Sequence, residues 1–196
     1  MVARLFRALA IASIVSAGFI QVFGDGLAAA YSMYGWKWCD NDASLSLQTN
    51  WQSSPDDSYS LDRQTVYDAA SAWSAVSTNF NFTQLAENVS ADVWVFSYSW
   101  GPSSLGTSTT NNFLGCAMNQ TVTFNEYYGW NPSSTYCNYS WSWYHLYAVA
   151  LQELGHSLGL DHSGNQNAVM YGSLTICTYK YLNQDDIDGI RDIYDY

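Results

Sequence analysis

The sequence predicts an α+β fold in which strands and a first helix are followed by two further helices. Two observations lead to this prediction. Short segments of alternating or densely apolar residues, the pattern of strands, recur between residues 36 and 125. Apolar residues spaced three and four apart, the pattern of a buried helix face, mark residues 143–158 and 185–194. Strands and a helix in the first part, then two helices, are typical of α+β domains.

The first part of the chain is predicted to hold strands around one helix. Residues 36–47 resemble an opening strand, with serine and leucine alternating at its end. Ser60 or Asp62 could cap a helix that runs to about Ser77. Its apolar stripe consists of Val66, Ala69, Ala70, Trp73 and Val76.

The middle of the chain is predicted to alternate strands with connections. Phe80 and Phe82 alternate, and residues 92–98 form an apolar run of strand length that Gly101-Pro102 ends. Residues 103–115 are small and polar, which predicts a loop. Residues 121–125 suit a strand, and residues 127–140 a long surface connection.

The last third contains the clearest helices. Residues 143–158 place apolar side chains on one side, and Gly159 stands where such a helix would end. A closing helix is predicted over residues 185–194, with Asn183 as its cap. Aspartates at positions 185 and 186 favour its first turn because they complement the helix dipole.

The N-terminus is typical of a secretory signal peptide. Arg4 and Arg7 precede an apolar run, and small residues at 28–30 suit cleavage after Ala28 or Ala30. The run is short for a membrane span, which needs roughly 20 residues. We therefore expect residues 1–30 to be the signal peptide, and residues 31–196 to form one secreted, extracellular domain.

The charge of the chain argues against two classes of binding partner. Its net charge is −11 at pH 7, and loss of residues 1–30, with Arg4, Arg7 and Asp25, makes it −12. Such an acidic protein is expected to bind neither nucleic acid nor, after signal cleavage, a membrane. We expect a monomer.

Four cysteines in an exported chain predict two disulfide bonds. No C-x-x-C pair occurs, which argues against a zinc site made of cysteines. Spacing leaves all three pairings open, and the short loop between Cys116 and Cys137 favours that pair.

The chemistry lies in the segment QELGHSLGLDH, residues 152–162, which holds two of the three histidines. Positions 152 and 156 are one helical turn apart, so their side chains project from the same face. Gly159 allows a sharp turn that can bring His162 back toward His156. Three protein ligands and a water form a catalytic zinc site, and Glu153 stands beside them.

This segment resembles the metzincin signature H-E-x-x-H-x-x-G-x-x-H, with glutamine in the first position. The sequence AVMY at 168–171 resembles the Met-turn of metzincins, and its Val-Met-Tyr is closest to the matrixin branch. The sequence LNQDDIDGI at 182–190 resembles the closing helix of matrixins. The specific resemblance covers residues 145–194, and a looser one covers the rest of the mature chain.

The resemblance implies a metzincin (zincin-like) domain of the peptidase M10 type, with a small twisted mixed sheet, an active-site helix and a C-terminal helix. It implies a zinc endopeptidase that cleaves proteins or peptides internally. One Zn²⁺ would be held by His156, His162 and, as a weaker ligand, Gln152. Glu153 would act as general base toward a metal-activated water.

Two residues of the Met-turn complete the implied site. Met170 would form a floor beneath the metal, and Tyr171 would line the cleft. His145 lies seven residues before Gln152, about 10 Å along a helix. It is therefore predicted to start the helix or lie on the surface rather than to replace the missing ligand.

Gln152 leaves a second function open. A neutral amide competes poorly with water for zinc, whereas imidazole is a good ligand. The alternative is a pseudoprotease, a protease fold that acts as a binding module without catalysis. Asp56, Asp57 and Asp185 could also bind Ca²⁺, although no EF-hand spacing occurs.

Overall fold

A computed structural model describes residues 29–48, 59–131 and 143–195 of the chain. Its helices are α1 (Tyr59–Ser74), α2 (Leu146–Ser157) and α3 (Gln184–Tyr194). Its strands are β1 (Ser32–Met33), β2 (Asp42–Leu47), β3 (Asn81–Gln84), β4 (Val93–Tyr98), β5 (Gly106–Phe113), β6 (Cys116–Asn125), β7 (Gly129–Asn131), β8 (Trp143–His145) and β9 (Leu160–Asp161). Nearly all of the predicted signal peptide lies outside the described residues.

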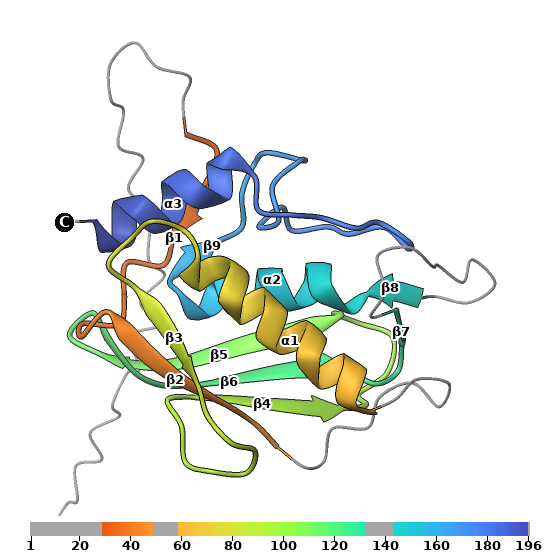
Figure 1. The fold of residues 1–196 in the computed structure, drawn as a ribbon. Coiled ribbons are helices and arrows are strands. Elements are labelled where there is room, and N and C mark those ends of the chain that lie inside the picture. The colour runs from red at the N-terminus through yellow and green to blue at the C-terminus, as the bar shows by residue number, and fades with distance from the viewer. Residues whose placement is uncertain (1–28, 49–58, 132–142, 196) are drawn as a thin grey trace, which may run out of the picture.

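The main sheet is mixed, as predicted. Its strand order is β3-β2-β4-β6-β5, with β3, β2, β4 and β6 parallel and β5 antiparallel to β6. Helices α1 and α2 lie over the same face of this sheet, and α3 lies beside the short β1–β9 pair (Figure 1). The predicted α+β class is therefore confirmed.

The core lies between the two long helices and the sheet. The predicted apolar stripe is buried throughout: Val66, Ala69, Ala70 and Trp73 lie in α1, and Val76 follows its end. The indole Nε1 of Trp73 donates to the backbone oxygen of Leu151 at 2.9 Å, which joins α1 to α2. Burial of these side chains stabilises the domain by about 25 cal/mol per Å² of apolar surface, and it fixes α2 above the sheet.

Several predicted elements are confirmed with shifted ends. The opening strand covers only 42–47, because the chain turns at Asn41, whose φ of 59° is tolerated by asparagine. Helix α1 begins at Tyr59, so Ser60 and Asp62 lie inside it rather than before it, and it ends at Ser74 rather than Ser77. Helix α3 carries the predicted Asn183 cap in a full capping box.

The predicted loop at 103–115 is wrong. Residues 106–113 form β5, which pairs along β6 and occupies an edge of the sheet. Polar residues suit this strand because an edge strand exposes one face to water, and its threonines favour extended backbone. Sequence polarity was mistaken for the absence of regular structure.

Helix α2 begins later than the sequence predicts. Residues 143–145 form β8, which pairs with β7, and the helix begins at Leu146. Strand β7 lies within the predicted surface connection, of which residues 132–140 fall outside the described residues. His145 therefore stands at the N-cap of α2, as predicted, but it is buried rather than exposed.

The favoured cysteine pair is wrong as well. Cys39 is bonded to Cys116, across 77 residues. Lys37 already pairs with Cys116 as an isolated β-bridge, so the fold brings the two cysteines together and loop length does not decide the pairing. Cys177 is also disulfide-bonded, and Cys137 lies outside the described residues.

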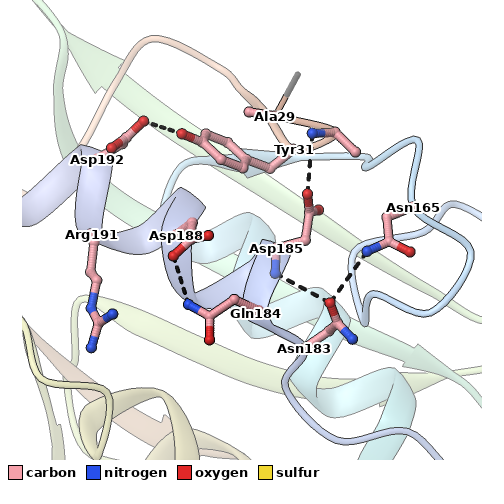
Figure 2. A pocket seen from close by; sticks show the side chains of 10 residues that line it. Ala29, Tyr31, Asn165, Asn183, Gln184, Asp185, Asp188, Arg191 and Asp192 are labelled. Carbon is pink, nitrogen blue, oxygen red and sulfur yellow. Dashed lines mark hydrogen bonds between the residues drawn. The ribbon is translucent and has the colours of Figure 1, made fainter. Parts of the chain in front are cut away.

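The first described residues are attached to α3. The backbone nitrogen of Ala30 donates to Asp185 at 3.1 Å, and the hydroxyl of Tyr31 donates to Asp192. Figure 2 shows the pocket that residues 29–31 and α3 line together, with Asp185, Asp188 and Asp192 among its α3 residues. This attachment brings the N-terminal segment to the end of the molecule where β9 lies.

Candidate functional site

Helix α2 carries three of the predicted site residues. Gln152 is half-buried, while Glu153 and His156 are 6% and 8% exposed. The helix is regular from Leu146 to Ser157, so positions 152 and 156 project from the same face. Apolar neighbours such as Leu151 and Leu154 are fully buried and hold the helix in the core.

A tight turn at Gly159 brings the fourth residue to the site. Gly159 has a φ of 98°, and a Cβ there would overlap the carbonyl oxygen of Trp36. The chain then runs through β9 to His162. The imidazole rings of His156 and His162 lie 4.9 Å apart between centroids, with their planes at 65°. Both conditions at position 159, the backbone angle and the space, exclude a side chain.

The surroundings of His156 prepare it to bind a metal. Its Nδ1 lies 2.9 Å from the backbone oxygen of Leu160, which makes Nδ1 the protonated nitrogen and leaves the lone pair on Nε2. Burial lowers the pKa of His156, so the ring is held in its neutral form. Neutral imidazole is the form that ligates zinc.

Gln152 is the third residue that the sequence predicts as a metal ligand. Its amide nitrogen donates to the backbone oxygen of Tyr171 at 3.3 Å, which ties α2 to the turn after Met170. The remaining polar atom of the amide is its carbonyl oxygen, an acceptor that can ligate a cation. In the described part of the chain, no three His, Cys, Asp or Glu side chains form a metal cluster. The predicted ligand set is two imidazoles and one amide, which would fit a divalent transition metal more weakly than three imidazoles.

Glu153 is a buried carboxyl group with unmet hydrogen-bonding capacity. Its Oε2 atom is buried and has no hydrogen-bond partner among the described residues. Burial raises the pKa of Glu153 to about 8. Gly106, the first residue of β5, packs directly against this side chain. A carboxyl group in such a dry place, with one oxygen free, can exchange a proton near neutral pH.

Met170 lies behind the helix at this site. It is fully buried, and its sulfur packs against Gly155, the residue before His156. Its backbone nitrogen and that of Val169 donate to Asp186 at 3.0 and 2.9 Å, and its oxygen accepts from Ser163 at 2.8 Å. The turn predicted from sequence is therefore held from both sides.

Tyr171 and His162 lie on the open side of the site. His162 is exposed, and its ring packs against Gly172, just after Tyr171. Lys180 stands 5.4 Å from the ring centroid of Tyr171. The carboxylate of Asp161 accepts a hydrogen bond from the backbone nitrogen of His162 at 2.7 Å.

Two other predicted residues lie apart from this group. His145 packs against the ring of Tyr179 at 5.3 Å, which accounts for its burial without a metal. Asp185, named as a possible calcium ligand, accepts hydrogen bonds from Ser163 and Ala30. Asp56 and Asp57 lie outside the described residues. Calcium binding thus stays a prediction without a site.

Sequence reasoning missed three neighbours of the site: Tyr34, Gly106 and Asp186. The hydroxyl of Tyr34 lies 3.4 Å from Nδ1 of His156. Only Asp186 had a signal in the sequence, since it occupies the fourth position of a capping box. Tyr34 and Gly106 reach the site through pairing of distant segments, for which no local pattern exists.

The helices of the described residues include none that is long and apolar enough to cross a membrane. Residues 37–195 match the sequence profile of the matrixin family, peptidase M10. This range includes every predicted site residue.

Similar proteins come from animals and plants. Human matrix metalloproteinase-26 is 34% identical over 146 residues, which are 67% of this chain and 51% of that protein. Bovine (Bos taurus) interstitial collagenase is 57% identical over 51 residues, 26% of this chain and 11% of that protein. Metalloendoproteinase 1 of Glycine max is 54% identical over 50 residues, 25% of this chain and 16% of that protein. The chain thus spans about half the length of the human relative and less of the other two.

Proposed function

Because the chain belongs to the matrixin family, we propose that it is a secreted zinc endopeptidase that hydrolyses internal peptide bonds of proteins. The observation that carries the proposal is the buried carboxyl group of Glu153 on the same helix as His156. The ring of His162 lies 4.9 Å from that of His156. The pKa of this glutamate is raised, and its Oε2 atom has no hydrogen-bond partner among the described residues.

The metal would be held by Nε2 of His156, by His162 and by the amide oxygen of Gln152. The hydrogen bond from Nδ1 of His156 to Leu160 supports this assignment, because it orients the ring and leaves Nε2 as the ligand atom. When bound, zinc supplies Lewis acidity, which acidifies a water molecule and polarises a carbonyl group. Met170 would support the ligand helix from behind through its contact with Gly155.

Glu153 would move the protons of the reaction. As general base it takes a proton from the attacking water, and as general acid it passes that proton to the leaving amine. Its burial excludes competing solvent, and a pKa near the working pH suits both directions of transfer. Tyr171 would line the cleft.

Strand β5 supports a protein or peptide as substrate. It pairs with β6 at the edge of the sheet, and its first residue, Gly106, lies against Glu153. An extended peptide can add to such an edge through backbone hydrogen bonds and so pass the general base. The names of two similar proteins, matrix metalloproteinase-26 and interstitial collagenase, point to the same substrate class.

The deciding experiment measures metal and activity on the mature protein. We expect about one zinc per chain by mass spectrometry, casein cleavage that EDTA abolishes, and loss of cleavage with retained zinc in Glu153→Gln. The glutamine is a matched control because it keeps the shape of the side chain and removes its basicity. A folded wild type that holds no zinc and leaves casein intact would overturn the proposal in favour of a binding module.

Secretion is tested separately from catalysis. Expression with residues 1–30 in a host with a secretory pathway is expected to release protein into the medium or periplasm. N-terminal sequencing should find the chain starting after Ala28 or Ala30. Retention of Arg4 and Arg7 in the exported or cellular protein would refute the signal peptide and leave the proposed chemistry untouched.

A further inference from the structure

Residues 30–39, which we call the N-terminal strap, run across the end of α2 and the turn that follows it. Ser32 and Met33 of β1 pair with Asp161 and Leu160 of β9. The backbone nitrogen of Tyr34 donates to Gly159 at 2.9 Å. At the other side of the turn, Gly164 donates to Ala30 at 2.8 Å. The strap thus holds the segment that leads from His156 to His162 by its backbone.

The far end of the strap is attached to the rest of the domain. The backbone nitrogen of Lys37 donates to the oxygen of Gly115 at 3.0 Å, and its backbone oxygen accepts from Ala117 of β6 at 2.8 Å. The indole of Trp38 donates to the oxygen of Ser157 at 2.7 Å. The bond between Cys39 and Cys116 closes this attachment covalently. The strap therefore connects the ligand turn to the sheet.

Tyr34 is the side chain of the strap that reaches a proposed ligand. Its ring lies 5.8 Å from that of His156, and its hydroxyl lies 3.4 Å from Nδ1. Trp36 stacks on Tyr34, with ring centroids 6.1 Å apart and planes 2° from parallel. Tyr34 thus contacts both rings although it is 47% exposed.

The hydroxyl of Tyr34 and the carbonyl of Leu160 lie on the same nitrogen of His156. Nδ1 is 2.9 Å from the carbonyl oxygen and 3.4 Å from the hydroxyl oxygen, so both can accept from its N–H. Two acceptors at Nδ1 favour the tautomer that carries its proton there. Nε2, the other ring nitrogen, then keeps the lone pair that a metal needs.

From these contacts we propose that Tyr34 is a positioning residue of the metal site, which fixes the ring and tautomer of His156 from a strap closed by the Cys39–Cys116 disulfide. This inference rests on the proposed function, since it concerns the same ligand. Tyr34 precedes the range matched by the matrixin profile, 37–195, so the family assignment does not supply it.

The test compares Tyr34→Phe with wild type and with Tyr98→Phe. Both variants lose one hydroxyl group and keep the ring, and Tyr98 is 64% exposed at the end of β4. The first readout is the imidazole ¹⁵N spectrum of metal-free, histidine-labelled protein at pH 8. Signals are assigned with His145→Asn and His162→Asn variants.

We expect the His156 ring of wild type to carry its proton on Nδ1. In Tyr34→Phe the two ring nitrogens should shift toward each other, as a fraction of the proton moves to Nε2. Tyr98→Phe should leave the spectrum unchanged. Zinc affinity, measured by competition with a chelator, should fall about threefold to tenfold in Tyr34→Phe. This is a small loss for removing a hydrogen-bond partner of a ligating imidazole, because the carbonyl of Leu160 still accepts from Nδ1.

A double variant, Cys39→Ala with Cys116→Ala, tests the strap without touching Tyr34. We expect the same direction of change in the His156 signals, because the far end of the strap is released. If both variants leave the His156 spectrum as in wild type, the positioning role is wrong. The proposed protease function can still stand in that case, since zinc content and casein cleavage are measured independently.

The reverse failure is also distinguishable. If wild type binds no zinc but Tyr34→Phe shifts the His156 signals, the positioning contact is established and the proposed metal chemistry fails.

Discussion

Gly106 at the start of β5 and Glu153 on α2 are in such close contact that no side chain fits between them. A Cβ at position 106 would lie 2.7 Å from Oε1 and 2.8 Å from Cδ of Glu153. The edge strand and the proposed general base therefore touch directly. This contact sets where the carboxyl group stands relative to any peptide that lies along β5.

Gly106→Ala is predicted to displace Glu153 and lower kcat/KM about tenfold to a hundredfold, since small misplacements of a catalytic group are costly. Thr107→Ala is the matched control, because Thr107 is the next residue, is exposed and points to the other side of the strand. Steady-state kinetics on a casein-derived peptide gives the comparison, and circular dichroism checks the fold. Equal kinetics for all three proteins would contradict the contact's importance.

Gln152→His is predicted to tighten zinc binding on the order of 100-fold, about 2.7 kcal/mol, because imidazole replaces an amide oxygen. Isothermal titration with a competing chelator measures the change. Gln152→Asn, which keeps the amide but shortens the side chain, should bind more weakly than wild type. An unchanged zinc affinity in Gln152→His would show that position 152 does not contact the metal.

Glu153 is predicted to make stability depend on pH in the metal-free protein. Its folded pKa is raised to about 8 by burial, above its ordinary value of 4.5. The folded state then binds the extra proton, so the stabilisation is full below about pH 4.5 and is lost as pH rises through 8. Because a difference of one in pKa corresponds to about 1.36 kcal/mol, the loss of unfolding free energy reaches a few kcal/mol.

Urea unfolding in EDTA at pH 5 and pH 8.5 checks this dependence. Glu153→Gln has no proton to lose, so the difference in unfolding free energy between variant and wild type should grow with pH in favour of the variant. The comparison cancels the other acidic residues, which both proteins share. A constant difference at both pH values would mean that Glu153 ionises normally in the folded protein.

Asp186→Ala is predicted to destabilise the domain by about 3 to 5 kcal/mol. It would leave the backbone nitrogens of Val169, Met170 and Asn183 without their acceptor, at roughly 1 to 3 kcal/mol for each buried donor. For a domain of this size the melting temperature should fall about 10 °C. Asp188→Ala, at an exposed position of the same helix, is expected to change it little. Similar melting for both variants would refute the role of Asp186 in holding the Met170 turn.

The helix and the turn that carry the proposed metal ligands could be predicted because their geometry is local. Gln152, Glu153 and His156 lie within little more than one turn of helix, whose spacing follows from backbone hydrogen bonding. Gly159 indicates the sharp turn in the sequence, because a φ of 98° favours glycine. The cap at Asn183 is equally local, and the sequence predicts it together with the helix that it begins.

Strand β5 could not be predicted, because its pairing with β6 outweighs a polar sequence that on its own suits a loop. The same holds for Cys39 and Cys116, which are 77 residues apart and are brought together by the bridge at Lys37.

The sequence by itself determined the family motif, the helices that carry it and the substitution at Gln152, since each depends on residues a few positions apart. Only the tertiary structure decided that Glu153 is buried against Gly106 and that Tyr34 reaches His156. These contacts join segments 47 and 122 residues apart, and burial itself is a property of the packed chain. A local pattern records which side chains share a helix face, whereas long-range packing decides what that face meets.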